Sequence, residues 1–404
     1  MSGEPLRVAI FAESYLPYLS GVTVSTETLA RGLGTAGHQV LLVAPRPAGD
    51  GQPGTAGAPG SEPAYAWLDS YQAPPPAPPG YRMPWPLPGR ALQQAREFAP
   101  HVVHPQSPFV SGLMARRIAQ RTAAPLVFTH HTRFGDYGHY LGPLAQAGRR
   151  AVGAYLGDFW RGCAAIVAPG SELAEEIGTQ RGPTRRPLVR TIPTGVDVRG
   201  IADLAPVDVR TAHGWPADAV VVVSLGRVAE EKNVHVLLDA FAVAAAGDPR
   251  LRFLLVGGGP STEQARERVA RPDLAGRVAL SGRLPHHDAL AQVRGGDLFA
   301  FASQTETQGL VLAEALAAGV PVVALRGPGV ADSVRDGQDG VVVETPPDPA
   351  AAAAALGAAI LRLAGDPQRR AALAAAARDG AERFAIERRI GQVVDLYREL
   401  LAAR

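Results

Sequence analysis

The sequence is poor in several features, and each shortage narrows what the protein can be. A single cysteine, Cys163, stands among 404 residues, which excludes an internal disulfide and is compatible with a cytoplasmic protein. Its apolar neighbours indicate a packing role for this thiol. The formal net charge is only +2, which gives no support for a nucleic-acid partner.

Long apolar runs are also missing. The longest, at residues 350–361, is mostly alanine and is shorter than the ~18 residues that a membrane-spanning helix needs. The first five residues are too few and too polar for a signal peptide. Hydrophobic residues make up 46% and charged residues 19%, as in soluble globular proteins, and the length favours two or three domains.

The chain is organised around residues 303–323, SQTETQGLVLAEALAAGVPVV, in which seven residues separate Glu306 from Glu314. An apolar segment at 298–302 predicts a buried strand before them, and the apolar spacing that follows predicts a helix. A glycine and a proline then predict where this helix ends. Glu306 therefore lies on a strand-to-helix loop, and Glu314 lies inside the helix.

The position of this loop predicts a ligand site, because open α/β sheets bind ligands beyond the carboxyl ends of their strands. The free N–H groups from Gly309 to Leu312 would face the same place, with the positive end of the helix dipole behind them. Two carboxylates beside an anion-binding helix end suit a ligand that is a sugar at one end and a phosphate at the other.

Residues 7–44 predict a strand at 7–12, a helix at 23–33 and a second strand at 39–44. Gly21 lies in the loop between the first strand and the helix. It is either a plain turn glycine or a position where a ligand approaches the backbone closely. The loop is not a phosphate-binding P-loop, since no Gly-Lys-Ser/Thr follows.

Residues 220–233 predict a strand that runs into a loop holding Arg227 and Lys232, with a helix from 234. Two cations on such a loop suit a diphosphate, at ~4 kcal/mol for each contact before desolvation is subtracted. A later strand, 251–256, ends in three glycines. The glycine pattern and the acidic residue of a dinucleotide fold are absent there, which makes a nicotinamide enzyme a poor fit.

Together these motifs resemble the retaining glycosyltransferases of family 4. The resemblance lies in Glu306-x7-Glu314, in G-R-x5-K-N at 226–233, and in T-I-P-T-G-V-D at 191–197, where a threonine replaces the asparagine of the family's hinge. It implies the α/β GT-B fold, in which two Rossmann-like domains face each other across a cleft.

The expected domains follow from this resemblance. Residues 1–198 form an acceptor-side domain, which contains a Pro/Gly-rich loop at 46–90, and residues 199–384 form the nucleotide-sugar domain. Residues 385–404 form a last helix that crosses back onto the first domain. Aromatic residues in the second half of the 46–90 loop indicate that part of it packs on the domain.

The implied reaction is retaining transfer of a hexose from a nucleotide sugar, with UDP-glucose favoured. The leaving diphosphate gains negative charge, so the site needs fixed positive charge beside it. The resemblance implies these catalytic residues: His131, Glu306, Arg227 and Lys232. It implies these donor-binding residues: Gly21, Arg227, Lys232, Arg283, Leu284, Glu306, Thr307, Gln308, Gly309, Leu310 and Glu314. Glu306 would hold hydroxyls of the sugar and Glu314 those of the ribose.

No cofactor or metal is expected, because the chain contains no Asp-x-Asp pair to hold a divalent ion on the diphosphate. Residues 129–140 resemble the diacylglycerol glucosyltransferases of bacteria and place His131 at the active-site histidine. A metal site of His131, Asp136 and His139 is an alternative, although these residues have no recognised ligand spacing.

A lipid acceptor implies a peripheral protein on the inner face of the cell membrane, held at an anionic surface by a cationic, partly apolar face. Two segments of the first domain are candidates for this face: Met114, Arg116, Arg117, Ile118 and Arg121; and Arg149, Arg150, Tyr155, Phe159 and Trp160. The alternative is that these arginines are solvated and the aromatic residues belong to the core.

Three other functions stay open. The first is a GDP-mannose-dependent mannosyltransferase acting on a lipid or polysaccharide. The second is a sugar-nucleotide 2-epimerase of the same fold, which the motifs at 226–233 and 306–314 argue against. The third is a non-catalytic nucleotide-sugar-binding protein, which the presence of every expected polar residue disfavours.

Overall fold

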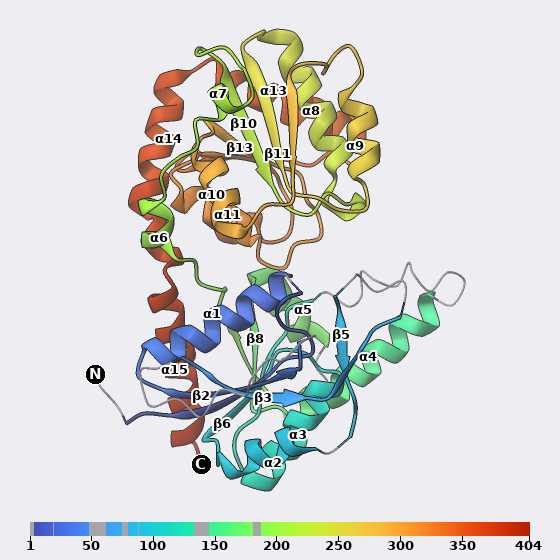
Figure 1. The fold of residues 1–404 in the computed structure, drawn as a ribbon, viewed down its shortest axis with the longest axis vertical. Helices are drawn as coiled ribbons and strands as arrows, with labels where there is room; N and C mark the ends of the chain where they lie inside the picture. The colour runs from blue at the N-terminus through green and yellow to red at the C-terminus, as the bar shows by residue number, and fades with distance from the viewer. Residues whose placement is uncertain are drawn as a thin grey trace. The chain divides into compact units, whose positions relative to one another are not determined.

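The structure, a computed structural model, describes residues 4–18, 20–47, 62–74, 80–87, 89–132, 145–180 and 187–404. It divides into two units, and Figure 1 shows the elements of each (Figure 1). Unit 1 is Met1–Gly195 with Ile386–Arg404, and unit 2 is Val196–Ala385. The boundaries expected from the sequence, at 198/199 and 384/385, lie within three residues of these.

Unit 1 is built on parallel strands with helical connections. Its elements are β1 (Arg7–Phe11), α1 (Gly21–Thr35), β2 (Gln39–Pro45), β3 (Ala64–Leu68), β4 (Ser70–Gln72), β5 (Arg82–Pro84), α2 (Arg90–Glu97), β6 (Val102–Pro105), α3 (Val110–Thr122), β7 (Val127–Thr129), α4 (Ala145–Arg161), β8 (Ala165–Ala168), α5 (Ser171–Gln180), β9 (Leu188–Thr191) and α15 (Ile386–Ala402).

The strand order in unit 1 is β3-β2-β1-β6, followed by β7-β8-β9, and a parallel bridge from Val103 to Leu126 links the two groups. The strands are almost wholly apolar because helices cover both faces of the sheet. One face packs with α2, α3 and α4, and the other packs with α1 and α15.

Within residues 46–90, the description as a Pro/Gly-rich loop was wrong for three segments. β3 extends the sheet beyond β2, and β4 pairs with β5 in an antiparallel hairpin. The proline-rich composition concealed a period-two pattern, in which Ala64, Ala66 and Leu68 are buried and Tyr65 and Trp67 are less so. The rings of Tyr65 and Trp67 stack at 5.0 Å and pack, partly buried, against the core beneath α1 and α15.

The last helix, α15, is part of unit 1 and packs across α1 (Figure 1). Its apolar face joins the core of β1 and β2, and Tyr397 is fully buried there. The Tyr397 hydroxyl lies 2.6 Å from Nδ1 of His104, and Nε2 of His104 lies 2.7 Å from the Thr129 hydroxyl. This buried chain of hydrogen bonds ties α15 to the ends of β6 and β7.

Unit 2 contains a second parallel sheet. Its elements are α6 (Val198–Asp203), α7 (Val209–Ala212), β10 (Val220–Leu225), η2 (Glu230–Lys232), α8 (Val234–Gly247), β11 (Leu251–Val256), α9 (Thr262–Val269), β12 (Val278–Gly282), α10 (His286–Arg294), β13 (Leu298–Phe301), α11 (Leu310–Ala317), β14 (Val322–Leu325), α12 (Val330–Ser333), β15 (Gly340–Val343), α13 (Pro349–Ala364), α14 (Pro367–Gly380) and η3 (Ala381–Phe384).

The strand order in unit 2 is β12-β11-β10-β13-β14-β15, and every pair is parallel. One core lies under α8 and α13, and the other lies under α10 and α11. The predicted helix after Glu306 is α11. It ends at Ala317 with Ala318 as its C-cap, and Gly319 follows with φ +75°, the left-handed conformation that commonly closes a helix.

Within the described residues, no helix by itself has the length and apolar character needed to span a bilayer. A pair of helices bent by 97°, Pro349–Ala364 and Pro367–Phe384, meets that test only when the two are taken together.

The buried hydrogen bonds of Tyr397 yield a first prediction. Tyr397→Phe leaves Nδ1 of His104 without a partner in the core, which costs about 1–3 kcal/mol of unfolding free energy. Tyr71→Phe is the matched control, because the contact of its hydroxyl among the described residues is a weak one, with the Met83 sulfur at 3.8 Å. Denaturant unfolding checks both variants. Equal stability of the two would show that the hydrogen bond does not hold α15 in place.

Candidate active site

The central strands of unit 2, β10 and β13, are neighbours whose following connections lead to opposite sides of the sheet. The chain after β10 continues to β11, and the chain after β13 continues to β14. Diverging connections of this kind open a crevice at the carboxyl ends of the two strands, where α/β proteins bind ligands. Lys232 follows β10 and Glu306 follows β13, so both residues lie at the carboxyl ends of these two strands.

Three polar contacts join the two loops. Lys232 Nζ lies 2.5 Å from Glu306 Oε1, and the Thr305 hydroxyl donates to the Glu231 carbonyl at 3.1 Å. The Asn233 side chain donates to the Ala302 carbonyl, also at 3.1 Å. Asn233 has φ +51°, which an asparagine tolerates better than most residues. The Glu306 carboxylate and the Lys232 ammonium, both predicted to contact the donor, therefore hold each other in place.

The amino end of α11 lies directly after the Glu306 loop. Gly309 caps it in the left-handed conformation, with φ +68° and no side-chain hydrogen bond. One expectation needs correction: the N–H of Leu312 is not free, because it donates to the Gly309 carbonyl at 2.9 Å. The N–H groups of Leu310 and Val311 bond to no residue in the described part of the chain, and they can bind an anion.

A second loop braces this helix end from behind. The Ser333 hydroxyl donates to the Gln308 carbonyl at 3.2 Å, and a Cβ on Gly329 would lie 2.6 Å from the Gln308 carbonyl carbon. Gln308 is thereby fixed through its backbone, while Thr307 stays partly exposed beside it. The two expected donor residues thus lie between Glu306 and the α11 end.

Arg227 stands at the crevice edge and is less constrained than Lys232. Its side chain is 55% exposed and pairs with Glu231 at 3.2 Å. The backbone under it is very close to β11, since a Cβ on Gly257 would lie 1.8 Å from the Gly226 carbonyl oxygen. Only glycine fits there, at φ +137°.

Arg283 and Leu284 follow β12, and the Arg283 Cγ would lie 2.9 Å from a Cβ on Gly258. Leu284 packs partly buried against the core beneath α10. Both residues therefore lie at the carboxyl edge of the sheet, as the predicted nucleotide site requires.

Glu314 differs from Glu306 in being buried. Its side chain is 6% exposed, and its Oε1 lies 3.2 Å from Nε2 of His286, the first residue of α10. The hydrogen bond to Glu314 raises the pKa of His286, against an opposing effect of burial. The sequence motifs did not indicate His286. The feature of the sequence that could have indicated His286 is its position, since it follows a strand that ends in glycine and then Pro285.

Unit 1 contains the remaining predicted residues, His131 and Gly21. Nε2 of His131 lies 2.8 Å from Oε1 of Gln106, which directly follows β6. Burial, with a smaller effect of His130, lowers the pKa of His131, so the imidazole is neutral near pH 7. Gln106 is buried and was not predicted, although its place at a strand's carboxyl end could have indicated it.

Gly21 begins α1, two residues earlier than the helix predicted from the sequence. The Ser20 hydroxyl caps this helix by accepting from the Thr23 N–H at 3.2 Å. A Cβ on Gly21 would meet no atom within 4 Å, so open space lies beside the backbone. The role of Gly21 in donor binding stays a prediction.

The prediction that the apolar residues of the membrane face are exposed was wrong. Met114, Ile118, Phe159 and Trp160 are buried in the core between α3, α4 and the sheet. Helical spacing cannot say which side of α3 faces the sheet, and the buried side is the one that carries Met114 and Ile118.

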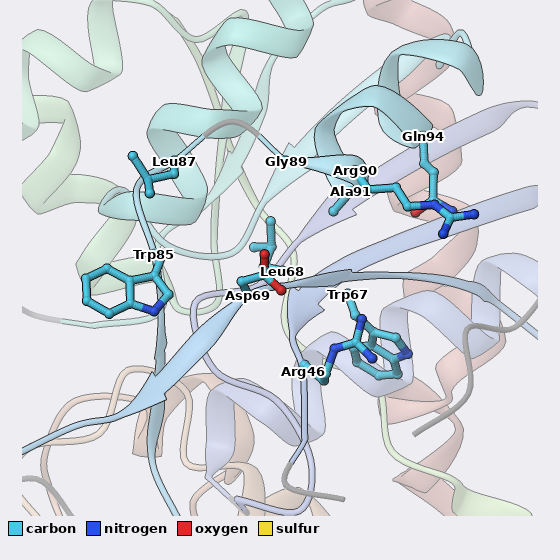
Figure 2. Close-up of a pocket in the computed structure, with 10 residues that line it drawn as sticks. All are labelled: Arg46, Trp67, Leu68, Asp69, Trp85, Leu87, Gly89, Arg90, Ala91 and Gln94. Carbon is cyan, nitrogen blue, oxygen red and sulfur yellow. The ribbon is translucent and has the colours of Figure 1, made fainter. Parts of the chain in front are cut away.

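A hollow of about 360 Å³ lies on unit 1 at the ends of β2 and β3. Figure 2 shows the side chains that line it (Figure 2). Trp67, Trp85, Arg46 and Arg90 line it, and the last of these begins α2. None of the predicted site residues lines this hollow.

No group of three or more His, Cys, Asp or Glu side chains in the described ranges is arranged to hold a metal ion. The stretch with Asp136 and His139 lies outside those ranges, so the alternative of a metal site there is not addressed.

Known proteins resemble the chain over most of its length. Residues 19–199 match the family described as Glycosyltransferase Family 4, and residues 208–380 match Glycosyl transferases group 1. A GDP-mannose-dependent alpha-mannosyltransferase of Mycobacterium tuberculosis is 30% identical over 341 residues, 84% of each chain. The chain is a family 4 glycosyltransferase.

Another relative of this glycosyltransferase is an alpha-monoglucosyldiacylglycerol synthase of Acholeplasma laidlawii, 26% identical over 352 residues, 83% of this chain and 84% of that one. Sucrose-phosphate synthase of Thermosynechococcus elongatus has a similar structure, with a TM-score of 0.74, 22% identity, and coverage of 99% of this chain and 100% of that one. The structure of Anabaena HepE in complex with UDP is also similar, with a TM-score of 0.72 and 18% identity. The match covers 98% of this chain and 100% of that one. The glycosyltransferase has the GT-B fold, as expected.

Gly309 provides the prediction for this site. Gly309→Ala forces alanine into a left-handed conformation at about 1–2 kcal/mol and presses a Cβ to 2.9 Å from Leu312 Cδ1. We expect a lower melting temperature and weaker nucleotide binding, because the end of α11 must shift. In Gly391→Ala, the control, the new Cβ meets nothing within 4 Å on α15, and stability should hold or rise. Unchanged melting and binding in Gly309→Ala would contradict this account.

Proposed function

We propose that the glycosyltransferase moves glucose from a nucleotide sugar, UDP-glucose first among candidates, to a hydroxyl of diacylglycerol or a related membrane lipid, with retention of configuration. The observation that carries the proposal is the Lys232–Glu306 pair at the crevice between β10 and β13, beside the amino end of α11. It combines a carboxylate for sugar hydroxyls with positive charge for a diphosphate.

In the proposed reaction, the bond from the sugar C1 to the diphosphate oxygen breaks and a bond from C1 to the acceptor oxygen forms. The acceptor hydroxyl gives up its proton, which the departing diphosphate accepts. Negative charge grows on the departing diphosphate. Lys232, Arg227 and the N–H groups at the start of α11 stabilise it, because they are oriented before the reaction begins. No bound metal is needed for this role.

The two glutamates have separate tasks. Glu306 accepts hydrogen bonds from hydroxyls of the transferred sugar, and Lys232 keeps its carboxylate in place. Glu314 accepts hydrogen bonds from hydroxyls of the ribose. His131, neutral and held by Gln106, contacts the sugar as positive charge develops near C1.

The glucosyl relative from Acholeplasma laidlawii supports the lipid acceptor, and HepE, solved with UDP, supports a uridine donor. The second candidate is transfer of mannose from GDP-mannose. The mannosyltransferase relative favours it, since its 30% identity exceeds the 26% of the glucosyl relative. Arg283 and Leu284, near the proposed base site, do not distinguish uracil from guanine.

A lipid acceptor also requires a surface that meets the membrane, on its inner face in this proposal. The exposed side of α3 supplies such a surface, in place of the side that carries the buried Met114 and Ile118. Phe109, Leu113 and Arg117 recur every four residues and therefore share one side of the helix, with Arg121 one turn further on. Phe109 and Leu113 are 42% and 44% exposed. This stripe is both apolar and cationic, as binding to an anionic surface demands.

The role of Glu306 is tested by Glu306→Ala. We expect kcat to fall by ~10²-fold or more, since one key transition-state contact is lost. Glu314→Ala should instead mainly weaken nucleotide binding. Glu344→Ala, at an exposed glutamate paired with Arg326, is the control and should keep full activity. Near-normal kcat for Glu306→Ala with any active donor would refute the assignment.

The α3 stripe is tested by sedimentation with anionic vesicles. Arg117→Gln should weaken binding about fivefold at low salt, because each basic residue contributes ~1 kcal/mol. Leu113→Ser should weaken it at both low and high salt, since its contribution is apolar. Val243→Ser, at a 43% exposed position in unit 2, is the control. If all three variants bind as the wild type does, α3 does not meet the membrane.

A further inference from the structure

Glu314 is a buried carboxylate with one side-chain partner among the residues that the structure describes. Its Oε1 lies 3.2 Å from Nε2 of His286, and only 6% of its side chain is exposed. Burying a carboxylate without a partner is costly, so a residue that pairs with it controls its charge and its orientation. His286 holds that position.

The packing of α10 on α11 brings the two side chains together. Leu290 and Val293 of α10 share an apolar core with Leu312 and Leu316 of α11. His286 precedes Leu290 by one helical turn and follows the loop at the carboxyl end of β12. Its side chain is 54% exposed, so the imidazole connects solvent with the buried carboxylate.

We propose that His286 is a positioning residue, which orients the Glu314 carboxylate for the ribose of the donor and makes donor affinity depend on pH. The inference rests on the proposed function, in which Glu314 holds the ribose. Nε2 of His286 lies at ion-pair distance from Oε1, 3.2 Å, and Oε2 is left to accept a ribose hydroxyl. The ribose meets a carboxylate that is already fixed, so less side-chain freedom is lost on binding.

The direction of the pH effect follows from the pair. The hydrogen bond to Glu314 raises the pKa of His286, so the imidazolium is present below that raised pKa and is lost as pH rises through it. Its loss weakens the hold on Glu314 and removes a positive charge beside the site of an anionic diphosphate. Donor affinity is therefore highest at low pH.

The charged neighbours of His286 do not change this direction. On α10, His287 and Asp288 contact each other, with Nδ1 of His287 3.3 Å from the Asp288 carboxylate. Arg283 precedes α10 and keeps its charge at every pH of interest. Glu314 is the charged residue of α11.

The test is calorimetric binding of UDP-glucose from about pH 5.5 to about pH 8. The diphosphate of this donor is esterified at both ends and its uracil N3–H stays protonated over this range, so the charge of the ligand is constant and the protein alone titrates. We expect the wild-type Kd to rise several-fold across this range. His286→Gln should bind about five- to tenfold more weakly at low pH, as loss of one polar contact of ordinary strength implies, with a flat pH profile. Its kcat at saturating donor should be unchanged.

Two comparisons make the result specific. His287→Gln removes an adjacent, exposed histidine and should keep the wild-type affinity and pH profile. A UDP-glucose analogue without the 2′ and 3′ hydroxyls should bind His286→Gln and the wild type equally at high pH, because there is no ribose hydroxyl for the carboxylate to hold.

Several outcomes would overturn the inference. Wild-type affinity for UDP-glucose in His286→Gln at every pH, with poor binding by Glu314→Gln, would refute the role of His286 and leave the ribose role of Glu314 intact. Equal loss of pH dependence in His286→Gln and His287→Gln would also refute it. Wild-type binding by Glu314→Gln would refute the ribose assignment in the proposed function, and the inference with it.

Discussion

The ion pair between Lys232 and Glu306 is the contact on which the candidate site depends. It joins two loops that are 74 residues apart in the sequence, at the place in unit 2 where two neighbouring strands send their connections away from each other. Both side chains are partly exposed, so the pair contributes little to stability. Its effect is on orientation, because an ammonium and a carboxylate that restrain each other present fixed charge to a ligand.

The backbone around this pair is built to keep it in place. Gly226 and Gly257 let β10 and β11 end in contact, and the Asn233 and Thr305 side chains bond across to the neighbouring loop. Unit 1 repeats the arrangement of strands, with β1 beside β6 and connections that diverge from them. There Gln106 holds His131, and His104 ties the same strand ends to α15 through Tyr397. Each unit therefore places its candidate residues at the carboxyl ends of the two neighbouring strands whose connections diverge.

The sequence predicted the parts of the fold that local pattern determines. The continuous apolar strand at β10 and the helical spacing of α11 each identify an element, and the two glutamates were placed correctly on a loop and inside a helix. Residues 64–68 were missed because proline and glycine dominate the composition around them. The side of α3 that faces the sheet was misjudged, since an amphipathic pattern with arginines on one side and methionine on the other fits either a core or a membrane.

The contacts made by His286 and Gln106 could not be predicted for a different reason. The His286–Glu314 pair arises from the packing of α10 on α11 and spans 28 positions of sequence, from 286 to 314. The Gln106–His131 pair likewise joins the ends of β6 and β7. Motif spacing reports residues that share one loop or one helix, whereas these partners meet only after the sheet has formed.

The most direct test of the proposed function is a transfer assay with the purified protein, in which UDP-glucose and GDP-mannose are each offered with diacylglycerol in anionic vesicles and with EDTA present. The anomeric configuration of the product is read by NMR. We predict an α-glucosyl lipid from UDP-glucose, formed without added metal and with the configuration of the donor retained. A product of inverted configuration, or transfer that stops in EDTA and returns with Mg²⁺ or Mn²⁺, would contradict the mechanism built on Lys232 and Glu306.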